Sequence, residues 1–190
     1  MDELIEFVIT VPEPFGAELA YKTRARTTLG VLTQLIACAQ RELVLAAPFI
    51  QAERSLIAGP LADALQAALR RGVRVDIVST HQSLQSLKQV NWLMDAKENI
   101  RFFQPKTNIE REGQLGSHAK FCIADKTAAY VGSANLTGPG LAEHLEMGFL
   151  VHGKYAKQIA DLWRFLVDKG FWIEHKKNFE WQDEFERTCL

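Results

Sequence analysis

Cysteine is scarce in this sequence, and its few copies do not form the pattern of a metal site or a disulfide framework. The three cysteines are Cys38, Cys122 and Cys189, an odd number without the spacing of metal ligands. This excludes a small secreted scaffold that depends on disulfides for its stability. We therefore expect reduced thiols in a cytoplasmic protein.

Long apolar runs and an excess of positive charge are also lacking. No apolar run approaches the roughly 18 residues that a transmembrane helix needs, and the acidic start MDELIEFVIT does not resemble a signal peptide, so we expect no membrane insertion. Because the net charge is −1, nucleic acid would have to be bound by a local basic patch. The candidates for such a patch, whose default interpretation is solvated surface, are Lys22, Arg24, Arg26, Arg54, Lys88, Arg101, Lys106 and Arg111.

What is present is an alternation of strand and helix patterns that predicts an α/β fold. The length of 190 residues favours a single domain over 1–190, with residues 1–20 and 171–190 peripheral. Apolar periodicity predicts strands at 4–11, 42–49, 73–80, 100–103, 119–125, 127–133 and 146–151, and helices at 24–40, 61–72, 83–97 and 153–169. Alternating elements followed by a hairpin predict a mixed sheet with helices on both faces.

The most informative stretch is 117–137, SHAKFCIADKTAAYVGSANLT. On a strand, His118 and Lys120 point to the same side because they are two residues apart. Cys122 lies on that side too, and we expect it to be a small packing residue. The opposite side is expected to be buried and consists of Ala119, Phe121 and Ile123.

After a turn at Asp125-Lys126, the chain returns and carries Gly132, Ser133 and Asn135 back beside His118. The predicted result is a cluster of one imidazole, one ammonium, one hydroxyl and one carboxamide. Gly132 would let the backbone pass close to a ligand.

This cluster suits a phosphate diester. Lysine, serine and asparagine donate to non-bridging phosphate oxygens and stabilise the charge that gathers there in the transition state. Neutral histidine can attack phosphorus near pH 7. A carboxylate at the far ring nitrogen would fix the tautomer, and Glu146 is our candidate. Asp125 is expected to orient Lys120 or to hold the turn.

The pattern H-x-K-x4-D-x6-G-S-x-N resembles the signature of the phospholipase D superfamily, and EMGFLV resembles the strand that follows it there. The resemblance implies an α-β-α sandwich around a mixed sheet. It implies the catalytic residues His118, Lys120, Asp125, Asn135 and Glu146, with Gly132 and Ser133 binding substrate. His81, after the strand 73–80, is either a further residue of the substrate groove or an exposed loop residue.

Within the superfamily, the chain resembles short single-motif bacterial proteins, of which some are nucleases and some belong to antiphage defence systems. The family chemistry uses a second histidine, from a second copy of the motif, to protonate the leaving alkoxide and to activate water. Since this chain has one copy, the resemblance implies a homodimer that shares one active site and forms a phosphohistidine. We expect no metal and no cofactor, because Lys120 and Asn135 supply the electrostatic stabilisation.

Three functions stay open. The leading one is a nuclease that cleaves DNA or RNA. The second is a phospholipid phosphodiesterase or phosphatidyltransferase, for which we expect an apolar loop or amphipathic helix. The third is a non-catalytic subunit of a defence system that binds nucleic acid or partner proteins, and an inactive copy of the fold is a related alternative.

Several other segments have competing interpretations. The pairs His152-Gly-Lys154 and His175-Lys-Lys177 lack the aspartate and the Gly-Ser, so we expect surface residues. Residues 104–116 form either a gating or dimer-contact loop or a plain connector. The aromatic tail 171–190 is expected to pack on the body or on a partner subunit instead of stacking on bases.

Overall fold

The computed structural model describes residues 4–96, 98–106 and 116–175. In this part of the chain, nine strands form one sheet in the order β2-β1-β8-β7-β6-β3-β4-β5-β9. β3, β4 and β5 are parallel, as are β1 and β2, and the other neighbours are antiparallel. The strands are β1 (Ile5–Thr10), β2 (Arg26–Thr27), β3 (Glu42–Ala46), β4 (Arg74–Val78), β5 (Ile100–Pro105), β6 (Phe121–Ala124), β7 (Ala128–Gly132), β8 (Glu146–His152) and β9 (Trp172–Glu174).

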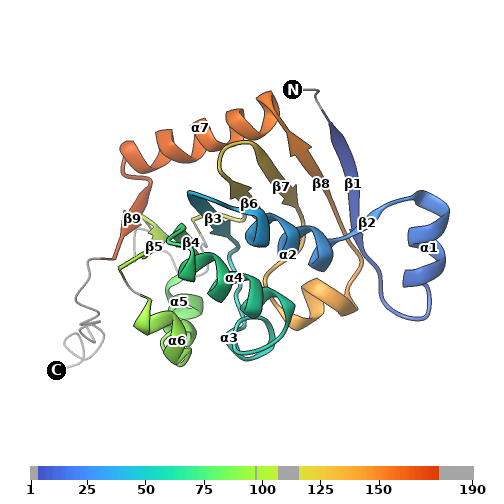
Figure 1. Ribbon diagram of the computed structural model, residues 1–190, viewed down its shortest axis with the longest axis horizontal. Helices are drawn as coiled ribbons and strands as arrows, with labels where there is room; N and C mark the ends of the chain where they lie inside the picture. The colour runs from blue at the N-terminus through green and yellow to red at the C-terminus, as the bar shows by residue number, and fades with distance from the viewer. Residues whose placement is uncertain (1–3, 97, 107–115, 176–190) are drawn as a thin grey trace.

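Helices cover both faces of the sheet, which confirms the predicted α-β-α sandwich around a mixed sheet (Figure 1). The larger core lies beneath α2 (Thr28–Cys38), α4 (Pro60–Arg70), α5 (His81–Leu87) and α6 (Asn91–Asp95). The smaller core lies beneath α7 (Lys154–Asp168). The remaining helical elements are α1 (Gly16–Thr23), which stands away from the body at the right of the view, α3 (Ala52–Ser55) and the π-helix η1 (Pro139–Glu143). Among the described residues, none of the helices combines the length and hydropathy that crossing a bilayer requires.

Two predicted helices have different bounds in the structure, and a cap explains one and a backbone break the other. The helix predicted at 24–40 begins at Thr28, because the Thr27 hydroxyl caps it by accepting from the Gly30 amide and residues 26–27 pair with β1 instead. The helix predicted at 83–97 is divided into α5 and α6 by Val90, whose ψ of 87° is not helical.

The ends of the chain are less peripheral than predicted. β1 lies between β2 and β8, although it falls within residues 1–20. β9 extends the sheet beyond β5, and its Trp172 is buried against Trp163 of α7 with ring centroids 5.8 Å apart. Trp172 therefore packs on the body, as predicted for the tail, whereas residues 176–190 lie outside the described part of the chain.

The β6–β7 hairpin is buried on both faces, where the sequence predicted one buried face. Cys122 and Tyr130 belong to the larger core, and Ile123 and Ala129 to the smaller one. Cys122 is confirmed as a packing residue, and burial raises the pKa of its thiol. Ala119 is exposed, contrary to prediction, because β6 begins only at Phe121.

Asp125 lies at the turn of this hairpin and joins it to the loop before β3. Its carboxylate accepts hydrogen bonds from the backbone amides of Gln40 and Arg41, each at 2.8 Å, and of Glu42 at 3.0 Å. Burial raises the pKa of Asp125, but these three amide bonds outweigh it and bring the pKa below its ordinary value. Asp125 and Lys126 both take a positive φ, of 51° and 61°, so the carboxylate holds a strained turn in place.

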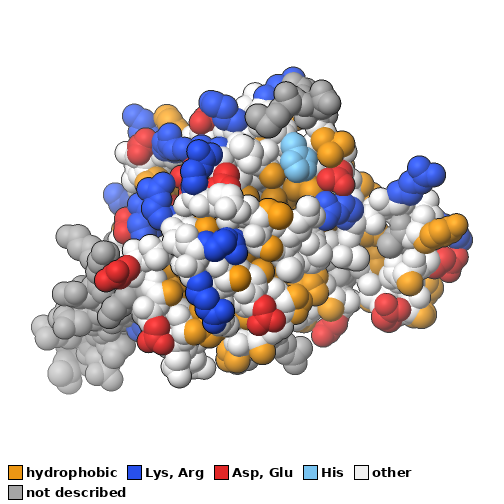
Figure 2. Space-filling model, in the orientation of Figure 1, with side chains coloured by type: hydrophobic (Ala, Val, Ile, Leu, Met, Phe, Trp, Pro, Cys, Tyr) orange, Lys and Arg blue, Asp and Glu red, His pale blue; other side chains and the backbone are white. Residues whose placement is uncertain are grey.

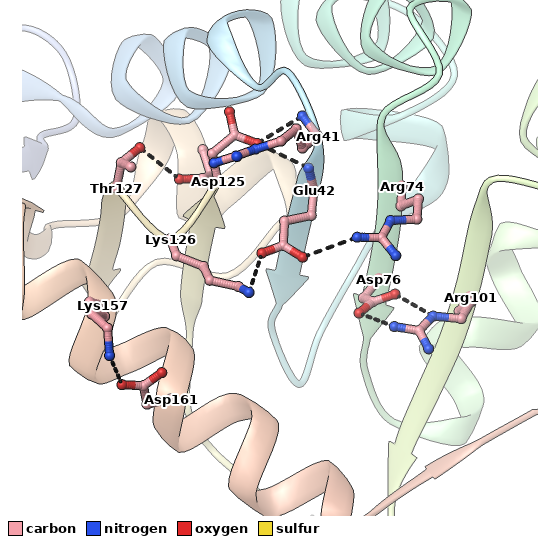
Figure 3. Close-up of polar contacts among 11 residues, drawn as sticks. Arg41, Glu42, Arg74, Asp76, Arg101, Asp125, Lys126, Thr127, Lys157 and Asp161 are labelled. Atoms are coloured by element: carbon pink, nitrogen blue, oxygen red, sulfur yellow. Dashed lines mark hydrogen bonds and ion pairs between the residues drawn. The ribbon is translucent and has the colours of Figure 1, made fainter.

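Charged side chains surround this anchor and pair with one another (Figure 3). Lys126 Nζ lies 3.0 Å from Glu42, and Arg101 binds Asp76 with two hydrogen bonds of 2.8 Å across β4 and β5. Figure 2 shows Lys and Arg interspersed with Asp and Glu over α7 and β3–β5. Arg101, one of the candidates for a basic patch, is therefore a partner in an ion pair.

The Asp125→Asn variant is expected to lower the free energy of unfolding at pH 7 by about 2 kcal/mol, because an amide accepts these backbone hydrogen bonds more weakly than a carboxylate does. The contribution of the Asp125 carboxylate to the free energy of unfolding is fully present above a pH of about 4. It is lost as the pH falls through the lowered pKa of Asp125. Urea denaturation from pH 7 to pH 3 should show the two proteins converging in acid. Asp161→Asn, which removes a solvated partner of Lys157, is the control and should change stability at pH 7 far less. Equal effects of both substitutions would contradict the anchoring role.

Candidate active site

One edge of the sheet collects most of the predicted site residues. The carboxyl ends of β3, β4 and β7 meet there with the amino ends of β6 and β8. His118 and Lys120 precede β6, Ser133 follows β7, and Glu146 begins β8. The antiparallel hairpin places the two halves of the motif side by side, because the Gly132 amide donates to the Lys120 carbonyl at 3.2 Å.

Lys120 is buried directly behind His118. Only 5% of Lys120 is exposed, whereas His118 lies at the surface. The Lys120 ammonium donates to the His118 carbonyl at 3.0 Å and lies 3.2 Å from Nδ1 of the His118 ring. Burial lowers the pKa of Lys120, and the charge of Glu146 opposes that shift. This ammonium has lost most of its hydration, so an anion that reaches it binds without having to displace a full water shell.

Glu146 and Ser133 form the second pair of the cluster. The Ser133 hydroxyl donates to Glu146 Oε2, and it accepts from the Met147 amide at 3.1 Å. Ser133 is thus held in place by β8 while its side chain stays exposed at the edge. The contact that the structure gives the Glu146 carboxylate is therefore with Ser133, and a contact with His118 stays a prediction.

Gly132 has a packing reason to be glycine. A Cβ at this position would overlap the Tyr130 hydroxyl and lie 2.6 Å from Tyr130 Cζ and 2.8 Å from the Met147 carbonyl. Gly148, opposite Gly132 in β8, faces the same ring, since its Cβ would lie 2.6 Å from Tyr130 Cε2. Close approach of a ligand to Gly132 stays a prediction, and Tyr130 is a neighbour of the site that the sequence reasoning missed.

Asn135 lies in the loop that follows β7, and contacts with two other segments of the chain fix the backbone around it. Its carboxamide oxygen is buried, so the amide nitrogen lies on the other side of the planar group. The next residue, Leu136, accepts from the Gln51 amide at 2.9 Å and from the Ser55 hydroxyl at 3.1 Å. Gly140 of η1 packs on the Asn135 backbone, because a Cβ there would lie 2.6 Å from its carbonyl oxygen. The run Gly138-Pro139-Gly140 was the sequence signal for this tight packing.

The structure does not bring Asp125 into the cluster, and a catalytic role for it stays a prediction. It lies at the other end of β6, about 16 Å along the strand from Lys120 at roughly 3.3 Å per residue. Its carboxylate binds the Gln40–Glu42 backbone, so it cannot orient Lys120 at the same time. Its alternative role, holding the turn, agrees with the structure.

His81 begins α5 just beyond the carboxyl end of β4. Its imidazole lies 3.1 Å from Gln85 Nε2, and its ring centroid lies 6.5 Å from that of His175. A role in substrate binding stays a prediction. His175 is half-buried, not a plain surface residue, and burial together with the charges of His81 and Lys88 lowers its pKa to about 4.

The predicted loop before the motif and the question of a metal ion complete the description of the site. Residues 107–115 of the predicted loop 104–116 lie outside the described residues, as does Arg111. Within the described ranges, no three His, Cys, Asp or Glu side chains come together as a group that could hold a metal ion.

Comparison with known proteins agrees with the fold. A family model described as "Cardiolipin synthase, PLD-like domain" matches residues 32–165. The DISARM protein DrmC of Bacillus paralicheniformis is 27% identical over 179 residues, which are 92% of this chain and 64% of that protein. The chain thus spans less than two thirds of the length of this relative.

Solved structures share the fold at low sequence identity. Nuc from Salmonella typhimurium, a phospholipase D family member, superposes with a TM-score of 0.62 at 18% identity, covering 92% of this chain and 99% of Nuc. NucT from Helicobacter pylori gives 0.62 at 15% identity, with 92% and 100% covered. Phosphatidylserine synthase from Haemophilus influenzae Rd KW20 gives 0.64 at 12% identity, with 92% and 40% covered.

The Gly132→Ala variant is expected to lower the free energy of unfolding by about 1–3 kcal/mol, because the new methyl group must displace Tyr130 or β8. Thermal unfolding followed by circular dichroism measures this change. Adding Tyr130→Phe should restore part of the lost stability, since it removes the hydroxyl that the methyl group overlaps. Additive effects of the two substitutions would show that the glycine is not required by this packing.

Proposed function

The chain belongs to the family of cardiolipin synthase PLD-like domains, in the phospholipase D superfamily, and from this premise we propose that it is a metal-independent phosphodiesterase. The observation that carries the proposal is the buried Lys120 ammonium, 3.2 Å from the exposed His118 imidazole at the open edge of the sheet. This arrangement places a positively charged group that can bind an anion next to a side chain that can act as a nucleophile. A magnesium ion is not needed to neutralise the phosphate where a lysine and two uncharged donors do so.

The proposed reaction has two steps. A ring nitrogen of His118 attacks phosphorus, a P–N bond forms, and the bond from phosphorus to the leaving oxygen breaks. Lys120, Ser133 and Asn135 donate to the non-bridging oxygens. In the second step, water attacks the phosphohistidine and the P–N bond breaks, which regenerates His118. Glu146 supports the imidazolium once Ser133 has turned to the phosphate.

A second acid–base group must protonate the leaving oxygen and then deprotonate the water. We propose that it is His118 of a second copy of the chain. An exposed apolar strip supports this, because it starts beside Glu146 and no helix of the described part of the chain covers it. The strip consists of Leu145, Met147, Phe149, Val131 and Phe7, and the rings of Phe7 and Phe149 lie 5.7 Å apart. Covering it in a dimer would remove an apolar surface from water next to the site.

Nucleic acid is the substrate that we propose first. The fold similarity to Nuc and NucT spans the full length of both, so their names favour a nuclease of the same size class. The DrmC relative favours a place in an antiphage defence system, with other proteins of that system as partners. A subunit that only binds nucleic acid there is the corresponding non-catalytic alternative.

A phospholipid substrate is favoured by one specific observation. No clear membrane-seeking segment is predicted from the sequence. However, α1 follows the site end of β1, and the side chains of its N-cap residue Phe15 and of Leu19 and Tyr21 within it are exposed. The family description and the match to phosphatidylserine synthase point to the same chemistry. The two classes of substrate are therefore compared directly in one assay.

In EDTA, the wild-type protein is expected to cleave single-stranded DNA, duplex DNA or RNA, and to leave phosphatidylcholine vesicles intact. His118→Asn should lose at least ~10³-fold in turnover, because the nucleophile is removed. His152→Asn, at the far end of β8, is the matched control and should keep wild-type turnover. Cleavage of vesicle lipid alone would replace the nuclease with the lipid enzyme. Loss of turnover in EDTA with recovery in magnesium would contradict the mechanism.

Mixing the wild type with His118→Asn tests the shared site. If one site needs His118 from both subunits, co-refolding equal amounts should halve the activity per wild-type chain, to about 50%. Independent sites would leave that activity unchanged. Mixing with Asp161→Asn, which keeps His118, controls for the refolding step, and light scattering measures the mass of the exchanged species.

A further inference from the structure

Tyr130 is the largest side chain that the fold buries fully, with 1% of its surface exposed. It projects from β7 into the larger core, directly beneath the segment Gly132–Asn135 that carries Ser133. At both Gly132 and Gly148 a Cβ would overlap this side chain, as well as the backbone of the neighbouring strand. Two neighbouring strands are thus shaped around Tyr130 at the point where the candidate site begins.

The Tyr130 hydroxyl is the polar end of a side chain of the larger core, and it lies beneath the Gly132 backbone. The Ala134 backbone and the Thr28 hydroxyl lie beside it, although neither makes a hydrogen bond of full geometry with it. Burial raises the pKa of the phenol, Ala134 and Thr28 oppose that shift, and the charge of Glu146 adds to it. The phenol oxygen is therefore electrically coupled to the carboxylate that binds Ser133.

Further buried polar atoms lie in the same region. They are the hydroxyls of Thr10 and Thr28 and the carboxamide oxygen of Asn135. Thr10 is paired with Glu146 across β1 and β8, and Thr28 begins α2. A core that needed only to be filled would take phenylalanine at position 130, since a buried hydroxyl without a good partner is unfavourable. Departures of this kind from a well-satisfied core are expected at functional sites.

We propose that Tyr130 is a positioning residue of the candidate site: its ring and hydroxyl, packed directly beneath the Gly132 backbone, set the height of Gly132–Asn135 above the sheet. The inference rests on the proposed function, because Ser133 and Asn135 are its phosphate donors. Tyr130 itself touches no reacting atom. The segment carries two donors that must meet the phosphate oxygens together with Lys120, and small displacements of such donors lower turnover strongly.

The test compares Tyr130→Phe with Tyr155→Phe, which removes a hydroxyl from α7 on the other face of the sheet. For Tyr130→Phe we expect kcat to fall about 10-fold with KM changed less than about twofold, because the donors act on the transition state. The Tm should stay the same or rise, since a poorly paired buried hydroxyl is removed. Tyr155→Phe should leave kcat and KM unchanged.

Amide NMR spectra supply a readout that does not depend on turnover. The resonances of Gly132, Ser133 and Ala134 should shift or broaden in Tyr130→Phe and stay in place in Tyr155→Phe. The inference is overturned if these resonances are unmoved and kcat is within about twofold of wild type. It is also overturned if kcat and Tm fall together, because loss of stability would then account for the loss of activity.

The two proposals fail in different ways. If the wild type cleaves no phosphodiester, the proposed function fails, and the amide spectra still decide whether Tyr130 holds the segment. If the wild type is active and Tyr130→Phe is indistinguishable from it in both readouts, only the role of Tyr130 is lost.

Discussion

The burial of the Lys120 ammonium is the constraint on which the candidate site depends. A buried cation needs partners, and this one finds a carbonyl and an imidazole in His118, two residues earlier in the chain. The same contacts that satisfy the ammonium hold the histidine at the surface. One interaction thus builds both the proposed anion site and the proposed nucleophile, while the nearby negative charge of Glu146 opposes the lowering of the Lys120 pKa by burial. A bound phosphate would be a further counterion.

The β6–β7 hairpin connects Lys120 and the candidate site to the rest of the fold. One end of the hairpin carries the candidate site, and the other is fastened by Asp125 to the loop before β3. Between the two ends, both faces of the hairpin are buried under helices. The spacing between lysine and aspartate in the motif is therefore the length of one buried strand, which explains why Lys120 and Asp125 of one signature lie about 16 Å apart.

Much of this could be predicted from the sequence, because the motif is local. His118 and Lys120 are two residues apart, and the return strand places Ser133 beside them through a tight turn. The partners of Asp125 could not be predicted in this way, because they lie 83–85 residues earlier in the chain. β9 was missed for a similar reason, since three residues of strand are defined only by their pairing with β5 and by the packing of Trp172 on Trp163. The packing role of Tyr130 could not be predicted from a single sequence, because one of the two glycines that contact it, Gly148, lies on the next strand.

The facing glycines at 132 and 148, with the tyrosine ring between the strands beneath them, also limit how this protein can change. A Cβ at either glycine would meet both the Tyr130 side chain and the backbone of the neighbouring strand, so a smaller residue at 130 relieves only part of the overlap. A substitution at either glycine alone therefore gives a less stable protein. Relatives that differ at positions 130, 132 and 148 should therefore have changed them together. Covariation among the three positions in an alignment would then indicate their contact, which no single position indicates by itself.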